Sequence, residues 1–150
     1  VAAAVHHCHQ LGVSHGDIKP DNVLYSVHGD GAITLALADF GTAVMEDRSR
    51  QRGGTPPYSA PEAFDPDTAY DPAAADMWSL GVTYFAMVTG ALPWSAPREE
   101  EPGYAEWVSR GALPLPAEIE LNDESAVLLH SLLSVEPRRR PSAGAVVTAL

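Results

Sequence analysis

Cysteine and positively charged residues are scarce in this sequence. Its single cysteine, Cys8, excludes an internal disulfide and a zinc site of the usual cysteine-based kind. We therefore expect a protein of a reducing compartment such as the cytoplasm. Lys and Arg number 9 against 20 Asp and Glu, a net charge of −11. This balance argues against a non-specific binder of nucleic acid or of an anionic membrane, which needs a basic face, and it predicts either a solubilising surface or cationic partners.

A secretory signal is also missing, because no basic segment with a cleavage site opens the chain. The sequence starts with Val1 rather than methionine, and we expect it to be a piece of a longer protein. The 150 residues are 45% hydrophobic and 19% charged, which is typical of one folded globular domain. We find no internal repeat.

The first half of the chain predicts a helix and a β-hairpin. Residues 1–12 have apolar side chains at three-residue spacing and end at a glycine. Residues 23–25 and 33–38 are apolar and β-branched, and a Gly-Asp-Gly turn separates them. This hairpin begins just after Asn22 and ends just before Asp39, so we expect the two polar residues to lie side by side.

A cluster of histidines, His6, His7 and His9, invites a metal-binding interpretation around Cys8. On a helix, however, only His6 and His9 share a face. Two ligands do not make a site, so we do not predict a metal there.

Residues 42–58 are polar and without periodicity, which predicts a long exposed loop. Residues 73–92 are nearly all apolar, and a helix that is apolar on every side is either buried or spans a membrane. Asp76 lies within this segment and no basic residues flank it, which favours a central buried helix. A buried acid of this kind requires a hydrogen-bonding partner.

The C-terminal part predicts further helices. A short helix is expected around 104–110, and another begins at the N-cap residue Asn122. A last helix is expected to start at Pro141 and to turn Ala145, Val146 and Ala149 inward.

Two polar segments carry the chemistry. The first reads His15-Gly16-Asp17-Ile18-Lys19-Pro20-Asp21-Asn22, and the second reads Asp39-Phe40-Gly41. A carboxylate, an ammonium group, an amide and a second carboxylate suit the task of holding a metal-bound polyphosphate beside an acceptor hydroxyl.

With three further segments, the chain resembles the C-terminal lobe of eukaryotic-type protein kinases, most closely the Ser/Thr branch. The further segments are Gly54-Thr55 to Ala60-Pro61-Glu62, Asp76-Met77-Trp78-Ser79-Leu80-Gly81, and Glu136-Pro137-Arg138-Arg139-Arg140-Pro141. All five occur in the family's order over nearly the whole chain, which makes the match specific. The resemblance implies that residues 1–150 are this lobe alone: a mainly α-helical bundle with a short β-hairpin at the catalytic cleft, part of a bilobal α+β kinase fold.

The resemblance also implies residue roles. Asp17 would orient the acceptor hydroxyl and take its proton, and Lys19 would neutralise charge on the transferred γ-phosphoryl of ATP. Asn22 and Asp39 would hold Mg²⁺ ions that bridge the nucleotide phosphates. Thr55 would pack against the catalytic acid and lysine, as in kinases specific for Ser and Thr.

Other matches concern binding and architecture. Leu24 would sit under the adenine of ATP. Asp21 occupies a position that relatives preferring basic substrates fill with an acid, which hints at basic sequences around the acceptor in a protein substrate.

Three pairings are expected to be structural. His15 would stack with Phe40, Asp76 would accept hydrogen bonds from the catalytic-loop backbone, and Glu62 would pair with Arg140.

The sequence departs from the family pattern at Gly16, where an arginine usually pairs with a phosphorylated residue of the activation loop. We hypothesise that activity does not depend on phosphorylation of that loop, for example at Ser49. In aminoglycoside phosphotransferases this motif also has the sequence His-Gly-Asp, so a small-molecule kinase is an alternative. A pseudokinase that serves as a scaffold is another.

The glycine-rich loop and strand lysine of the family's N-terminal lobe are absent from these residues, so we expect this chain alone to be inactive.

Overall fold

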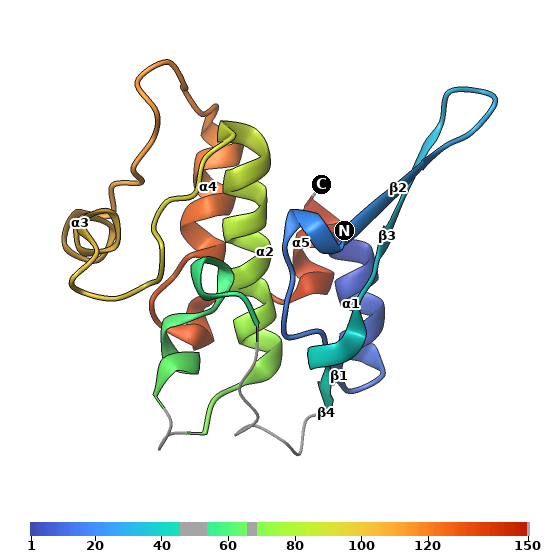
Figure 1. Cartoon of the computed structure of the whole chain (residues 1–150), viewed down its shortest axis with the longest axis horizontal. Helices are drawn as coiled ribbons and strands as arrows, with labels where there is room; N and C mark the ends of the chain where they lie inside the picture. Colours follow the sequence, from blue (N-terminus) through green and yellow to red (C-terminus); the bar gives the residue numbers. More distant parts are fainter. Residues whose placement is uncertain (46–53, 66–68, 150) are drawn as a thin grey trace.

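The structure is a computed structural model that describes residues 1–45, 54–65 and 69–149. Helix α2 (Pro72–Thr89) lies at its centre, and the other helices surround it (Figure 1). The carboxylate of Asp71 caps α2 by accepting hydrogen bonds from two backbone N–H groups of the first turn. Gly90 ends the helix in the left-handed conformation with a φ of 69°.

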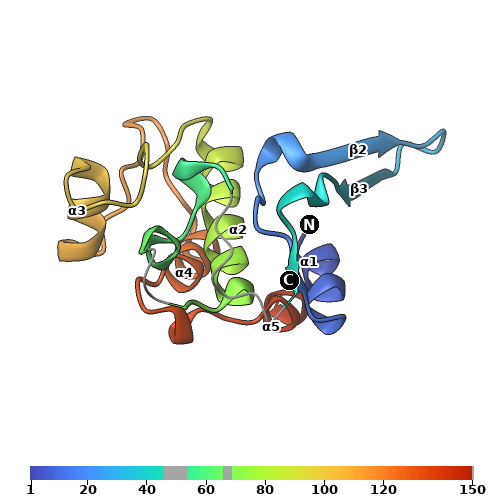
Figure 2. The same ribbon diagram turned by 60° about the horizontal axis from the view of Figure 1, so that its bottom comes forward.

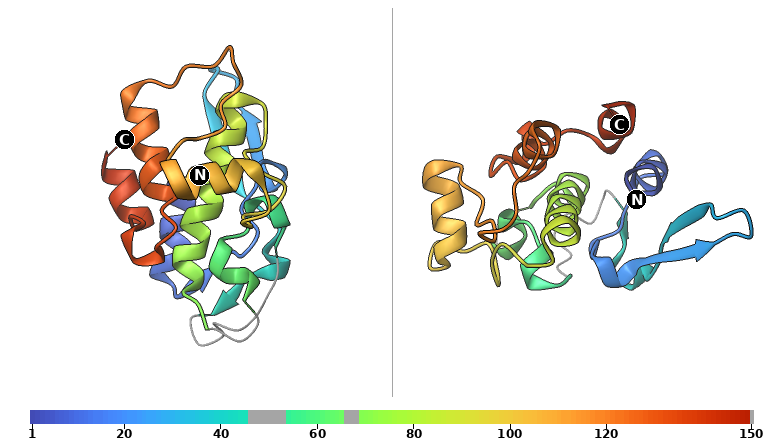
Figure 3. Two further views of the ribbon diagram at one scale, coloured as in Figure 1. Left: turned by 90° about the vertical axis from the view of Figure 1, so that its left-hand side faces the viewer. Right: turned by 90° about the horizontal axis from the view of Figure 1, so that it is seen from above.

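The helices around α2 form two groups (Figure 3). On one side, α1 (Ala2–Gln10) packs against α5 (Ala143–Ala149). On the other side, α4 (Asp123–Leu132) packs directly against α2, and α3 (Pro102–Arg110) lies farther out. The mainly helical architecture that the sequence predicts is therefore confirmed.

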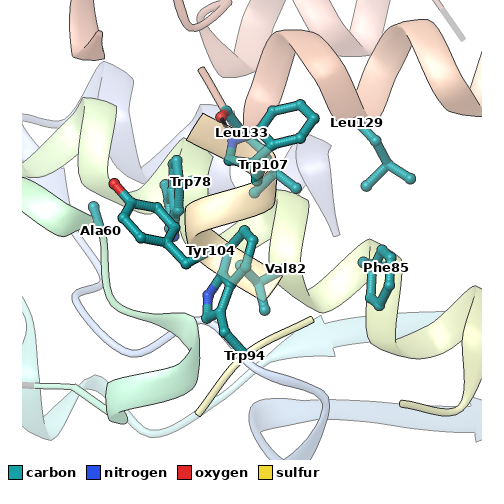
Figure 4. Packing of buried hydrophobic residues seen from close by; sticks show 9 residues of the cluster. All are labelled: Ala60, Trp78, Val82, Phe85, Trp94, Tyr104, Trp107, Leu129 and Leu133. Atoms are coloured by element: carbon teal, nitrogen blue, oxygen red, sulfur yellow. Dashed lines mark hydrogen bonds between the residues drawn. The ribbon is translucent and has the colours of Figure 1, made fainter. Parts of the chain in front are cut away.

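Both sides of α2 are buried in hydrophobic clusters. The larger cluster is rich in aromatic side chains, and Figure 4 shows its members: Ala60, Trp78, Val82, Phe85, Trp94, Tyr104, Trp107, Leu129 and Leu133. The second cluster comprises Val5, Ile18, Met77, Leu80, Leu132, Ala143 and Val146. Burying a large apolar side chain contributes about 1.5–3 kcal/mol, so these contacts dominate the stability of the fold.

The central helix is buried as predicted, and it ends at Thr89, just before the helix-stopping Gly90. Met87 and Val88, in its last turn, are exposed. Among the described residues, no helix is long and apolar enough to cross a membrane.

The predicted hairpin is formed by β2 (Val23–Val27) and β3 (Ile33–Leu37), which pair antiparallel with Val23 opposite Leu37. It projects from the helical body (Figure 2), and its outer part is exposed. At its base, the N–H of Ala38 donates to the carbonyl of Asn22 at 2.9 Å. The two polar segments thus meet where the hairpin joins the body.

The expectation of an uninterrupted loop over 42–58 is wrong at its start. Strand β4 (Val44–Met45) pairs antiparallel with β1 (Val13–Ser14), and Val44 is buried. A two-residue strand is too short to show alternation, and its partner lies about thirty residues away in the sequence, so no local pattern could reveal it. Residues 46–53 lie outside the described part.

The C-terminal helices correct one further prediction. Asn122 caps α4 as expected, accepting from the N–H of Ser125 at 2.8 Å. Helix α5, however, begins at Ala143 because Ser142, rather than Pro141, precedes its first turn and accepts a hydrogen bond from it. Its inner residues are therefore Ala143 and Val146, whereas the predicted Ala145 and Ala149 are exposed.

Single-turn 3-10 helices connect these elements. They are Pro20–Asn22, Phe40–Thr42, Pro56–Tyr58, Pro61–Phe64 and Pro137–Arg139.

Candidate active site

Asp17 is the centre of a cluster of polar side chains in the loop that follows β1. The ammonium group of Lys19 donates to Asp17 Oδ2 and to Thr55 Oγ1, each at 2.7 Å. The hydroxyl of Thr55 donates in turn to Asp17 Oδ1 at 2.8 Å. The structure thus brings together three residues that the sequence predicts to act together, although Thr55 lies 38 positions after Asp17.

The charges in this cluster stabilise one another. Burial alone would raise the pKa of Asp17, but hydrogen bonds from Lys19 and Thr55, together with the lysine charge, hold the pKa of Asp17 below its usual value. The hydrogen bond to Asp17 raises the pKa of Lys19, and the charges of Asp17, Asp21 and Asp39 raise it further against the effect of burial. A carboxylate and an ammonium group therefore coexist at neutral pH.

Asn22 joins the cluster from the base of the hairpin. Its Nδ2 donates to the backbone carbonyl of Asp17 at 2.8 Å and to Asp17 Oδ2 at 3.3 Å. Because both partners are acceptors, the amide nitrogen must face Asp17, and the amide oxygen of Asn22 then points elsewhere.

Asp39 follows β3 at the same end of the hairpin. It adopts the left-handed conformation with a φ of 61°, and its Oδ1 accepts from the N–H of Gly41 at 3.2 Å. A side chain in this conformation costs about 1–3 kcal/mol, and such strain concentrates at functional sites. Amide and carboxylate oxygens are the ligands that Mg²⁺ takes in proteins, so Asn22 and Asp39 are a donor set that fits this ion.

Asp76 of helix α2, which is 1% exposed, accepts hydrogen bonds from the backbone of the Asp17 loop. Its Oδ2 accepts from the N–H of His15 at 2.7 Å, and its Oδ1 accepts from the N–H of Gly16 at 2.9 Å. His9 Nε2 also lies 2.9 Å from Asp76 Oδ2. The buried acid of the central helix therefore has its predicted partners.

His15 is buried and holds two segments together. Its Nδ1 accepts from the N–H of Asp17 at 3.3 Å, so its Nε2 carries the proton that it donates to the carbonyl of Ala38 at 2.9 Å. Its ring and that of Phe40 form a T-shaped pair with 4.7 Å between ring centroids. The expected pairing of His15 with Phe40 is therefore present, but the rings meet edge-on at an interplanar angle of 65° rather than stacked.

The segment that carries Thr55 is anchored by a buried ion pair. Arg140 donates to both carboxylate oxygens of Glu62, with Nη2 to Oε2 at 2.9 Å. Its guanidinium group also bonds the carbonyls of Ala74 and Ser134 and lies over the ring of Trp78. The expected pairing of Glu62 with Arg140 is confirmed, and breaking it from one side should be costly.

Gly16 adopts a φ of +79°, and a Cβ there would lie 2.7 Å from the backbone oxygen of Thr42. The position therefore combines a left-handed backbone with a close approach of main chain, both of which suit glycine. Ser49, which bears on the hypothesis about phosphorylation, lies outside the described residues.

Leu24 is 56% exposed on β2, and its role beside the adenine stays a prediction.

Two residues of the site escape the sequence argument. In the sequence His9 belongs to a histidine cluster, but in the structure it bonds Asp76, and the described residues contain no group of three or more His, Cys, Asp or Glu side chains that could hold a metal ion. Thr42 donates its hydroxyl proton to the carbonyl of His15 at 3.1 Å. The sequence holds one indication of the role of His9: a buried acid such as Asp76 requires hydrogen-bond donors, and a histidine can supply one.

Comparison with known proteins gives a consistent result. The family model described as "Protein kinase domain" matches residues 1–149. The chain is 35% identical over 147 residues to "Serine/threonine-protein kinase GIN4" of Saccharomyces cerevisiae, covering 93% of this chain and 12% of the yeast protein. It is 38% identical over 152 residues to "Calcium-dependent protein kinase 9" of Oryza sativa subsp. japonica, covering 98% and 25%.

A third relative is "CBL-interacting serine/threonine-protein kinase 5" of Arabidopsis thaliana, 35% identical over 151 residues that cover 97% of this chain and 32% of the plant protein. The chain thus spans a third or less of the length of each of these relatives.

Proposed function

Because this chain belongs to the protein kinase family, we propose that the protein transfers the γ-phosphoryl group of ATP to Ser or Thr hydroxyls of other proteins. One observation carries the proposal: Asp17, Lys19, Thr55 and Asn22 form a single hydrogen-bonded cluster at the base of the hairpin. Phosphoryl transfer depends on positioning and charge neutralisation, and these groups supply both.

Asp17 positions the acceptor hydroxyl. Its lowered pKa keeps it ionised at neutral pH, so it accepts a hydrogen bond from the hydroxyl of the substrate. A carboxylate of low pKa is a weak base, so it takes the proton only as the hydroxyl oxygen bonds to phosphorus and becomes acidic. Its bonds to Lys19 and Thr55 hold the carboxylate in one orientation during this step.

Lys19 stays protonated and places its positive charge 2.7 Å from Asp17 Oδ2, where it stabilises charge on the group in transfer. Asn22 and Asp39 would hold Mg²⁺ through their side-chain oxygens. When bound, Mg²⁺ neutralises the charge of the nucleotide phosphates. Leu24, exposed on β2 beside this site, offers an apolar surface to the adenine.

The segment that begins at Thr55 favours a protein substrate over a small molecule, because it links the Asp17 cluster to the helical core. The hydroxyl of Thr55 bonds Asp17, and the same segment is fixed to the helical core through Glu62 and Arg140. An extended peptide laid along this rigid segment would reach Asp17 with its hydroxyl. Asp21, exposed beside the cluster, favours basic residues near the acceptor.

The test uses the intact protein with Mg²⁺, radiolabelled ATP and a library of Ser/Thr peptides. We expect label on Ser or Thr, a preference for basic peptides, and a loss of at least about 100-fold in kcat for Asp17→Asn. The control is Asp30→Asn in the hairpin turn, where an amide can keep the hydrogen bond to the N–H of Ala32 and activity should be unchanged.

Other results would overturn the proposal. Transfer to aminoglycosides but not to peptides would indicate a small-molecule kinase. Nucleotide binding without transfer would indicate a scaffold. The 150 residues alone should transfer nothing, because the nucleotide site then lacks a cover, and appreciable peptide phosphorylation by the isolated chain would contradict this.

Regulation follows from Gly16, which offers no cation to a phosphorylated loop residue. Phosphatase-treated intact protein should therefore keep its kcat. Inactivity after treatment, restored by phosphorylation at Ser49, would refute this independence.

A further inference from the structure

Gly54, the residue before Thr55, lies unusually close to the main chain of the Asp17 loop. A Cβ on Gly54 would lie 2.6 Å from the backbone oxygen of Gly16 and 3.3 Å from Ser59 Oγ. It would also lie 3.7 Å from Asp17 Oδ1. A side chain could swing away from such a contact, but a backbone oxygen cannot move without moving the loop.

The backbone conformation of Gly54 is the second constraint. Its φ of +92° is a value that residues with a side chain rarely adopt. Gly31, in the hairpin turn, has a similar φ of +82°, yet nothing lies within 4 Å of the position of its Cβ. The two glycines share the conformational requirement, and only Gly54 adds a steric one.

We propose that Gly54 is the positioning residue that lets Thr55 reach Asp17 and Lys19, so that a Cβ at position 54 would pull the Thr55 hydroxyl out of the cluster. The inference rests on the proposed phosphoryl-transfer function and concerns the same site. A Cβ at Gly54 and the oxygen of Gly16 must separate by roughly 0.8 Å to reach ordinary contact at 3.4 Å. Thr55 follows directly in the chain, and its hydrogen bonds of 2.7 and 2.8 Å cannot both survive a shift of that size.

The experiment compares Gly54→Ala with Gly31→Ala in the intact protein. We expect Gly54→Ala to lower kcat by about 10- to 100-fold, because misplacing a reacting group by about 1 Å has effects of this order. The KM for ATP should change less than about twofold, since Asn22 and Leu24 are untouched. Gly31→Ala carries the same conformational strain without the contact, and it should keep the kcat of the unaltered protein.

Two further variants separate positioning from loss of folding. Asparagine tolerates a positive φ but carries a Cβ, so Gly54→Asn should lose kcat as Gly54→Ala does. If Gly54 acts through Thr55, the double variant Gly54→Ala/Thr55→Val should have the kcat of Thr55→Val alone. A crystal structure of Gly54→Asn should show Thr55 Oγ1 more than 3.5 Å from Asp17 Oδ1.

The outcomes distinguish the two proposals. If the unaltered protein transfers no phosphoryl group, the proposed function and the role of Gly54 fall together. If the unaltered protein is active, two results would overturn the role of Gly54 and leave the proposed function standing. One is a Gly54→Asn variant with full kcat. The other is a double variant whose fold-decrease in kcat is the product of the decreases of the two single variants.

Discussion

Replacing Asp76 by asparagine should loosen the Asp17 loop while leaving the shape of the core unchanged. The carboxylate accepts from the N–H groups of His15 and Gly16 and contacts His9 Nε2. An amide has one acceptor oxygen, so in either orientation its NH₂ group faces one of the two backbone donors. A buried N–H left without an acceptor costs about 1–3 kcal/mol, and hydrogen bonds to a charged group are worth about 1.5–3 kcal/mol each.

The neutral amide is cheaper to bury than a carboxylate, which offsets part of this loss. We therefore expect Asp76→Asn to lower the free energy of unfolding by about 2–4 kcal/mol, a large share of the 5–15 kcal/mol typical of a domain. Urea titration of the intact protein measures this change. Because the loop carries Asp17, kcat at a temperature where the variant is folded should fall by at least about tenfold.

Asp71→Asn is the matched control on the same helix. Asp71 is exposed and caps α2, and asparagine is an equally good N-cap residue. The free energy of unfolding of this variant should therefore lie within about 0.5 kcal/mol of that of the unaltered protein. An Asp76→Asn variant that is as stable and as active as Asp71→Asn would show that Asp76 does not hold the loop.

Two further predictions concern packing and pH. Gly81→Ala should destabilise the protein by about 1–2 kcal/mol, because its Cβ would lie 2.9 Å from the buried side chains of Leu132, the last residue of α4, and of Leu133. Overpacking of this kind outweighs the gain of about 1 kcal/mol in helix propensity. Gly144→Ala is the control: the three atoms nearest to its Cβ all belong to the ring of His6, a side chain that can rotate away, so thermal unfolding should show a neutral or stabilising effect. Equal losses in both variants would contradict the argument. The lowered pKa of Asp17 means that the ionised carboxylate stabilises the fold above about pH 4, and that this stabilisation is lost as the pH falls through the folded-state pKa. Asp17→Asn should therefore be less stable than the unaltered protein at pH 7, and this difference should shrink as the pH falls below about 4. A difference in urea midpoint that stays constant from about pH 7 into this acidic range would refute this.

The parts of the fold that the sequence predicts are those with a local signal. The hairpin has apolar runs on both sides of a Gly-Asp-Gly turn, and α4 has Asn122 as a cap, so both appear where expected. The pairing of β1 with β4 has no such signal, because each strand is two residues long and their contact is distant in sequence. Helix α5 is misplaced by two residues because Ser142 competes with Pro141 for the start of the helix.

In the site, too, some contacts could be predicted from the sequence and others could not. The resemblance to protein kinases implies that Asp17, Lys19 and Thr55 act together, and the structure brings them within hydrogen-bonding distance. The bond between His9 and Asp76 could not be predicted, because the sequence says that a buried acid needs a partner but not which of several histidines will supply it. The close approach of Gly54 to Gly16 was equally hidden, since a glycine before a threonine is common in turns.

Most anchors of the Asp17 loop are made to its backbone rather than to its side chains. Asp76 accepts from the N–H groups of His15 and Gly16, and Asn22 donates to the carbonyl of Asp17. None of these bonds depends on the side chain at position 16. The glycine that stands here in place of the arginine usual in the family therefore leaves these anchors intact, while its φ of +79° and the nearby oxygen of Thr42 leave no room for a side chain in this backbone. The substitution removes a cation that could bind a phosphate and leaves the cluster for phosphoryl transfer in place, so its consequences should appear in regulation and not in the chemical step.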